Sequence, residues 1–265
     1  MLVHLNRIIL TIFISIITTL SFADSQHSHG ANTNYLKTYW SFKGIFGTFD
    51  RASLQRGYQV YQEVCAGCHS VQHLSYRNLS EKGGPEFSIE EAKAIAAQFE
   101  VEDGPNSEGE MFMRPARLSD KFVKPYPNVE ASTAANGGAY PPDMSVLAKA
   151  RAGGADYIYS LLLGYEEPPT GFELDDGVYY NKYMYGNMIK MPNPLSDGLL
   201  EYNDGTEASE EQMAKDVVTF LAWAAEPHLE ARHKIGFKAI IYLIILSLLA
   251  YLSMKRLWSR IESKV

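Results

Sequence analysis

The chain has 265 residues, of which 46% are hydrophobic and 21% are charged, and its formal net charge is -7 at neutral pH. It contains only two cysteines. The cysteine count excludes a disulfide-rich scaffold, and the net negative charge argues against a nucleic-acid-binding surface.

The N-terminal residues 1–23 have the pattern of an export signal. Arg7 gives a short positive region, residues 8–20 are apolar, and Ser21 and Ala23 have the small-x-small spacing of a cleavage site. The apolar run is shorter than the ~20 residues that span a bilayer, which disfavours an anchor. A mitochondrial presequence would be Arg-rich and amphipathic. We therefore expect export to a bacterial periplasm.

The sequence C-A-G-C-H at residues 65–69 is the pattern at which haem is attached covalently in c-type cytochromes. Cys65 and Cys68 would each bind one vinyl group, and His69 would be the proximal iron ligand. Two cysteines three apart on a helical turn project from one face, so both reach one edge of the ring. The single motif predicts one haem c.

Two other interpretations of this motif are a thioredoxin-like redox pair and half of a zinc site. A zinc site needs about four nitrogen or sulfur ligands, and these are the only two cysteines. A redox pair would open a helix after a strand. Here a helix leads into the motif, with Asp50 as N-cap and with Leu54, Tyr58 and Tyr61 at helical spacing.

The rest of the exported segment reads as helices joined by long loops. Ser88 with Glu91, and Ser209 with Gln212, have the spacing of capping boxes, so we expect helices over 88–99 and from 209 to near Pro227. Further helices are expected over 144–150 and 156–163. Residues 104–138 are rich in Pro, Gly and polar residues and are predicted to form an ordered loop.

The negative charge is concentrated between Glu81 and Glu110. This stretch has nine acidic residues against Lys82 and Lys93, a local balance of -7. A solvated face is the usual meaning of such a run, and a docking surface for a basic protein is the alternative.

A haem iron held by histidine needs a second axial ligand for electron transfer, and methionine is the typical one. Met191 lies in K-M-P-N-P-L at residues 190–195, where two prolines stiffen the loop. Met191 is the preferred candidate and Met188 is the next.

Residues 235–254 are almost continuously apolar and match the ~20 residues that cross a bilayer. Lys238 lies near the start of this run, where it can snorkel to the interface. The basic residues that follow place the C-terminal tail in the cytoplasm by the positive-inside rule. We therefore expect an export signal over 1–23, a periplasmic domain over 24–234, and an anchor with a short tail over 235–265.

Several segments together resemble the cytochrome c1 family, the haem subunit of the ubiquinol:cytochrome c reductase (cytochrome bc1) complex. The resemblance runs in order over residues 39–256. The matching segments are RGYQVYQEVCAGCHS from Arg56, EDGPNSEGEMFMRPARLSD from Glu102, KPYPN from Lys124, AANGGAYPPDMS from Ala134, LLLGYEEPPTG from Leu161 and AKDVVTFLAWAAEP from Ala214.

The resemblance implies a mainly α-helical cytochrome c-type domain with long loop insertions and one C-terminal transmembrane helix. It implies His69 and Met191 as the iron ligands, although this chain has M-P-N-P where many members have M-A-P-P. Partners of the haem propionates fall on Arg151 and Tyr157, and a segment lining the haem pocket falls on Pro141 and Pro142.

The function implied is electron transfer from the Rieske iron-sulfur protein to cytochrome c, alongside cytochrome b in a dimeric complex of the bacterial inner membrane. No separate catalytic activity is expected of this chain alone. The alternatives are a freestanding membrane-tethered cytochrome c that donates to a terminal oxidase, a haem peroxidase, which would need an open sixth iron position, and a scaffold with a structural haem.

Overall fold

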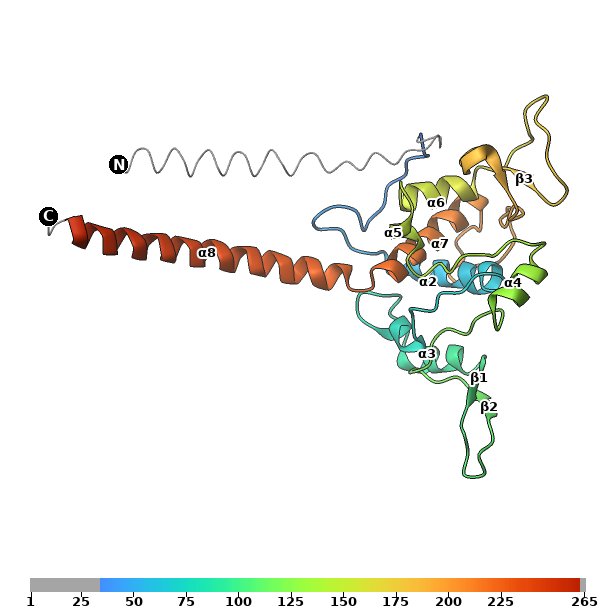
Figure 1. The fold of residues 1–265 in the computed structure, drawn as a ribbon, viewed down its shortest axis with the longest axis horizontal. Helices are drawn as coiled ribbons and strands as arrows, with labels where there is room; N and C mark the ends of the chain where they lie inside the picture. Colours follow the sequence, from blue (N-terminus) through green and yellow to red (C-terminus); the bar gives the residue numbers. More distant parts are fainter. Residues whose placement is uncertain (1–33, 263–265) are drawn as a thin grey trace.

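A computed structural model describes residues 34–262. The predicted export signal, residues 1–23, lies outside this range. The described chain forms a mainly helical domain, from which one long C-terminal helix projects (Figure 1). The prediction of a mainly α-helical domain with one C-terminal apolar helix is confirmed.

The helix that precedes the C-A-G-C-H motif is α2, Arg51–Val60. Asp50 caps it, because its carboxylate accepts a hydrogen bond from the Ser53 main-chain N–H at 3.1 Å. The helix then widens into a π turn, η1, Tyr61–Cys65, in which the Ala66 N–H donates to the Tyr61 carbonyl at 2.8 Å. Such turns insert one extra residue into a helix. Cys65 is the last residue of this turn.

Helix α2 packs against α7, Glu210–Ala225. A glycine makes the close approach possible: a Cβ atom at Gly57 would lie 2.1 Å from the Asp216 carbonyl oxygen and 2.8 Å from the Phe220 Cβ. Aromatic rings fill the space beside this crossing, and Tyr61 stacks on Phe220 with ring centroids 5.5 Å apart. The core of the domain therefore lies directly behind the C-A-G-C-H motif.

The predicted capping box of Ser88 and Glu91 is formed. The Ser88 hydroxyl accepts from the Glu91 N–H at 3.1 Å, and the Glu91 carboxylate accepts from the Ser88 N–H at 2.8 Å. The helix is α3, Ile89–Ala96, and it packs against the short 3-10 helix η2, Tyr76–Ser80.

The segment predicted as loop, 104–138, contains more regular structure than expected. Strand β2, Phe112–Pro115, pairs with β1, Glu100–Asp103, in an antiparallel hairpin that projects from the domain (Figure 1). Helix α4, Val129–Ala135, follows with Asn128 as its N-cap. Strands of four residues and a helix of two turns are too short for their periodicity to stand out.

The second half of the domain contains two short helices, α5, Leu147–Ala150, and α6, Ala155–Leu162, both packed on α7. The predicted helix over 144–150 is thus shorter than expected, and the one over 156–163 is close to its predicted bounds. A small sheet pairs β3, Tyr179–Tyr180, with β4, Met188–Ile189, around the 3-10 turn η3, Tyr185–Asn187.

At the start of α7, only half of the predicted capping box is formed. The Ser209 hydroxyl accepts from the Gln212 N–H at 3.2 Å, as expected. The Gln212 amide donates instead to the Asp216 carboxylate at 2.9 Å. The Asp216 carboxylate is fully buried and accepts this hydrogen bond, because a buried charge without hydrogen-bond partners is costly.

The last helix is α8, Leu229–Glu262. Within the described residues it is the one helix long and apolar enough to cross a membrane, and its apolar window is not buried by the rest of the domain. Its first turn is fixed to the domain, because the Glu230 carboxylate accepts hydrogen bonds at 2.9 Å from the Phe49 N–H and from the Arg51 guanidinium.

Candidate haem site

The cysteine–histidine motif begins at Cys65, the last residue of the π turn. Main-chain N–H groups of Cys68 and His69 donate to the Cys65 carbonyl at 3.1 and 2.9 Å, which makes a tight helical turn of the motif. Cys65 is partly buried against the core and Cys68 is exposed. Burial raises the pKa of the Cys65 thiol to about 12, with a further contribution from Cys68.

The imidazole of His69 is oriented by the main chain of a distant segment. Its Nδ1 lies 2.9 Å from the Pro142 carbonyl oxygen. A carbonyl can only accept a hydrogen bond, so Nδ1 carries the proton and Nε2 keeps its lone pair. Burial lowers the pKa of His69, which favours the neutral ring. The site therefore presents an imidazole whose Nε2 is free to bind a metal.

Asp143 holds the Pro142 carbonyl in place. Its carboxylate accepts hydrogen bonds from the Ser70 hydroxyl at 2.7 Å, from the Gln72 N–H at 3.0 Å and from the Ser145 N–H at 2.9 Å. The Met144 N–H donates to the Ser70 carbonyl at 2.8 Å. These contacts join the residues after the motif to residues 142–145.

The loop of Met191 is fixed at its start by two hydrogen bonds. The Met191 side chain is partly buried and packs against the same hydrophobic core as Cys65. The Met191 carbonyl accepts a hydrogen bond from the Tyr165 hydroxyl at 3.0 Å, and the Lys190 ammonium donates to the Gly137 carbonyl at 3.1 Å. Met188 lies in β4 and is 45% exposed. The packing therefore favours Met191 over Met188 as a ligand in a dry site.

Arg151 and Tyr157 flank the start of α6. Arg151 is exposed, and Tyr157 is partly buried with its hydroxyl 3.7 Å from the Met184 sulfur. Burial raises the pKa of Tyr157, and the nearby charge of Arg151 opposes this shift. The two side chains are therefore close enough to interact electrostatically. Pro141 is partly buried and Pro142 is exposed.

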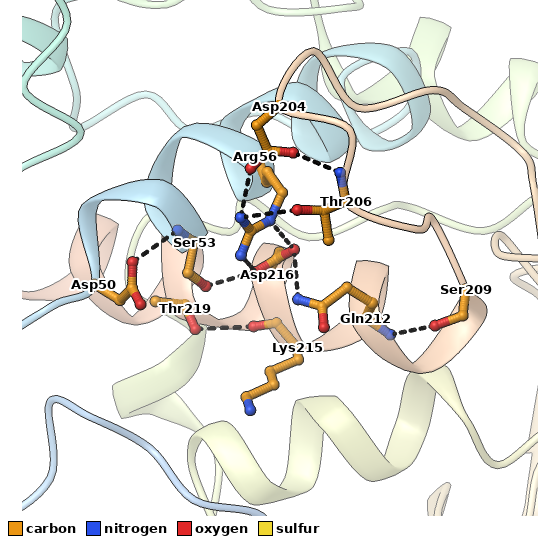
Figure 2. A network of polar contacts seen from close by, with 10 residues as sticks. All are labelled: Asp50, Ser53, Arg56, Asp204, Thr206, Ser209, Gln212, Lys215, Asp216 and Thr219. Atoms are coloured by element: carbon orange, nitrogen blue, oxygen red, sulfur yellow. Dashed lines mark hydrogen bonds and ion pairs between the residues drawn. The ribbon is translucent and has the colours of Figure 1, made fainter.

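Helix α2, which leads into the motif, is joined to α7 by a buried ion pair (Figure 2). Arg56 of α2 donates to the Asp216 carboxylate of α7 at 2.8 Å, and that carboxylate has no solvent exposure. Ser53 donates to Asp216 at 2.6 Å, and Asp204 binds the outer side of Arg56 at 2.7 Å. The pKa of Arg56 is raised because these carboxylates outweigh the effect of burial.

Two parts of this arrangement were missed in the sequence, the carboxylate of Asp143 and the ion pair of Arg56 with Asp216. Asp143 accepts from the main-chain N–H two residues later, as in an Asx turn, so the available signal was the aspartate itself, directly after two prolines. The ion pair joins residues 160 positions apart, and single-sequence patterns carry no information on such a contact.

Comparison with known proteins gives a consistent result. Residues 40–261 match the family model described as Cytochrome C1 family. The chain is 52% identical over 226 residues to "Cytochrome c1-2, heme protein, mitochondrial" of Solanum tuberosum, with 85% of each chain covered. It is 48% identical over 226 residues to "Cytochrome c1, heme protein, mitochondrial" of Saccharomyces cerevisiae, covering 85% of this chain and 72% of that one.

A bacterial relative is longer. "Cytochrome b/c1" of Bradyrhizobium diazoefficiens is 47% identical over an alignment of 239 residues, and the match covers 83% of this chain but only 35% of that protein. The region that the family model matches, residues 40–261, contains the motif, the Met191 loop and most of α8. The chain belongs to the cytochrome c1 family.

Proposed function

We propose that this chain is the haem-bearing electron-transfer subunit of a cytochrome bc1 complex, with one haem c bound through thioether bonds to Cys65 and Cys68. The observation that carries the proposal is the hydrogen bond of His69 Nδ1 with the Pro142 carbonyl, which leaves Nε2 free next to two thiols. Metal-bound histidines typically donate their other N–H in this way. The residues present therefore fit a haem c.

Haem, when bound, supplies one-electron chemistry. The chain's residues position it and adjust its potential. His69 and Met191 are proposed as axial ligands, a pairing that raises the potential. Arg151 and Tyr157 are proposed to bind the propionates, where a guanidinium gives charge-assisted hydrogen bonds. Pro141 and Pro142 are proposed to line the haem pocket.

The division of the chain follows from the same assignment. Residues 1–23 are proposed as an export signal, 24–234 as a periplasmic haem domain, and 235–265 as a membrane anchor with a short cytoplasmic tail. The single long apolar helix of the described residues supports the anchor. The proposed location is the bacterial inner membrane, with the haem domain on the periplasmic side.

The proposed direction of transfer is from the Rieske iron-sulfur protein to cytochrome c, with cytochrome b as the membrane partner in a dimeric complex. Membership of the family supports this order. No side chain of this chain is required to form a bond to a substrate, so we assign it no catalysis of its own.

Haem staining after denaturing electrophoresis tests the covalent attachment. The wild-type polypeptide should stain, and the Cys65→Ala, Cys68→Ala double variant should not. Gly67→Ala is the matched control inside the motif, because a Cβ at Gly67 meets no atom within 4 Å, and it should stain like the wild type. Staining of the double variant would overturn the assignment.

Purification in mild detergent through a tag on this chain tests membership of the complex. Co-isolation of a dihaem cytochrome b and a Rieske protein is expected. A haem-bearing chain isolated without them would point to the tethered carrier instead.

A further inference from the structure

A loop next to the base of α8 presents two large apolar side chains to solvent. Ile45 is 77% exposed and Phe46 is 76% exposed, more than any large hydrophobic residue of the described part of α8. Their neighbours in sequence, Phe42 and Phe49, are buried and stack with ring centroids 5.1 Å apart. Two buried aromatic residues thus form the base of the loop, and two exposed apolar residues lie between them. We call the exposed pair the Ile45–Phe46 tip.

The loop is held by its own main chain. The Gly47 N–H donates to the Gly44 carbonyl at 3.1 Å, and the Thr48 N–H donates to the Ser41 carbonyl at 3.1 Å. Gly44 has a positive φ of 92°, and a Cβ at Gly47 would lie 2.2 Å from the Phe42 carbonyl oxygen. Both positions therefore need glycine, and the tip has a defined direction.

The loop is also fixed relative to α8. The Phe49 N–H, three residues after the tip, donates to the Glu230 carboxylate in the first turn of the helix. The ring of Phe46 meets that of Phe237 edge-on, with centroids 6.4 Å apart. Phe237 is two residues into the apolar run that begins at Ile235. The tip therefore reaches the level at which the membrane-crossing part of α8 begins.

Cationic side chains lie at this same end of the molecule. Lys43 precedes the tip and pairs with Asp156 at 2.9 Å, with half of its side chain still exposed. Lys234 and Lys238 are exposed on α8, on either side of Phe237 in sequence. Apolar side chains at the tip with cations behind them match the layering of acyl chains and phosphates at a bilayer surface.

We propose that the Ile45–Phe46 tip inserts into the interfacial region of the lipid bilayer, as a second membrane contact beside α8. Aromatic and aliphatic side chains are favoured at this depth, and Lys43 would remain among the phosphates. Together, the loop and α8 make two contacts with one surface, and these two contacts fix the tilt of the domain over the membrane.

The occupant is lipid because the tip adjoins the apolar run that α8, as the proposed anchor, would present to lipid. Phe46 meets Phe237 edge-on, and the exposed apolar side chains of α8 begin at Ile235, so the tip lies beside the first apolar side chains of the helix. A partner protein or a second copy of the chain would have to cover the tip at the point where the lipid phase begins.

Site-specific photocrosslinking tests the proposal. A benzophenone amino acid replaces Phe46 in the full chain, reconstituted in vesicles of phosphatidylcholine and phosphatidylglycerol, and adducts are identified by mass spectrometry. Leu248, 56% exposed within the apolar run, is the positive control, and Met113, 57% exposed on the projecting hairpin, is the negative control. Lipid adducts are expected at positions 46 and 248 and should be absent at 113.

The inference rests on the proposed membrane anchor, and crosslinking at positions 46 and 248 distinguishes failure of the inference from failure of the anchor. Failure at position 248 would overturn the span itself. Lipid adducts at 248 without any at 46 would overturn only the proposal for the tip. A crosslink from position 46 to a second copy in vesicles, or to another polypeptide in native membranes, would also overturn it. Because residue 46 is exposed, unchanged heat unfolding should accompany the substitution.

Discussion

Gly57 lies directly against the main chain of Asp216, so that a single added methyl group at Gly57 would lie 2.1 Å from the Asp216 carbonyl oxygen. The contact is between two helix backbones, and neither can rotate away as a side chain would. The position of the C-A-G-C-H motif relative to α7 therefore depends on the absence of a side chain at one position.

Gly57→Ala should destabilise the domain by about 2 kcal/mol, because the clash moves α2 away from α7. The loss of stability from the clash is larger than the gain of about 1 kcal/mol expected from replacing a glycine in a helix. Denaturant unfolding of the full chain in detergent measures the difference. Gly67→Ala, with open space around it, should be close to neutral. Equal stability of the two variants would show that the helices adjust without cost.

Arg56→Met should cost about 3 kcal/mol, because it leaves the fully buried carboxylate of Asp216 without its cation. Lys149→Met is the matched control, since it removes an ion pair with Glu226 from a half-exposed lysine. That exposed pair should contribute under about 1 kcal/mol. Similar losses in both variants would contradict the importance assigned to burial.

Acid should weaken the contact of Asp204 with Arg56. The hydrogen bond from the Thr206 N–H, followed by that from Arg56, lowers the pKa of Asp204 to about 2. A carboxyl group with a lowered folded-state pKa contributes stability above its unfolded value, near 4, and loses that contribution as the pH falls toward 2. The melting temperature of Asp204→Asn should therefore lie below that of the wild type at neutral pH and converge with it near pH 2.

Asp176→Asn, at an exposed position in another loop, is the control for this titration. It should follow the wild type across the whole range. A constant difference between Asp204→Asn and the wild type at every pH would show that the lost stability does not come from the ionised carboxylate.

Met191→Leu should keep the haem attached but allow carbon monoxide to bind the reduced iron, and it should lower the midpoint potential, since the thioether is lost. Met188→Leu is the control and should change neither property. Visible spectra with and without carbon monoxide, together with a redox titration, measure the effect. The reverse pattern would place the ligand at Met188.

The hairpin refines the hypothesis on the acidic stretch. Glu100 and Glu102 are exposed on one face of β1, whereas Asp103 pairs with Arg114 of the neighbouring strand. Glu100→Gln with Glu102→Gln should therefore slow electron delivery to a basic cytochrome c at low salt and flatten its salt dependence. Exposed charges are screened beyond ~8 Å at physiological salt.

Stopped-flow oxidation of the reduced protein across a salt series measures this effect. Asp103→Asn serves as the comparison, because it should loosen the hairpin more than it alters the external field. An unchanged salt slope in the double variant would identify the stretch as a solvated face.

Patterns with a strong local cause could be predicted from the sequence. The cap of α2 by Asp50 and the capping box of Ser88 and Glu91 depend on neighbours within three residues, and both are present. The apolar run of α8 is also a local pattern, because it is a continuous stretch of the sequence. The motif at residues 65–69 carries its chemistry in its spacing. The ligand role of Met191 remains a prediction.

Contacts between distant segments could not be predicted. The orientation of His69 depends on a carbonyl 73 residues away, and the half-formed capping box of Gln212 depends on a buried carboxylate at position 216. Main-chain carbonyls leave no trace in a residue pattern, since every residue has one. For both His69 and Gln212, the tertiary structure determines which hydrogen-bond partner the side chain takes, and the local sequence does not.

The π turn at Tyr61–Cys65 separates two requirements that would otherwise compete for one helical face. Each residue of an α-helix advances by roughly 100°, so one extra residue in a turn rotates everything after it by about that angle. The face of α2 that carries Gly57 therefore remains against α7, Cys65 is turned onto this face, where it packs against the core, and Cys68 is turned away from it and is exposed. A continuous α-helix would place Val64 and Cys68 in line with Gly57 and Tyr61, toward the packed core.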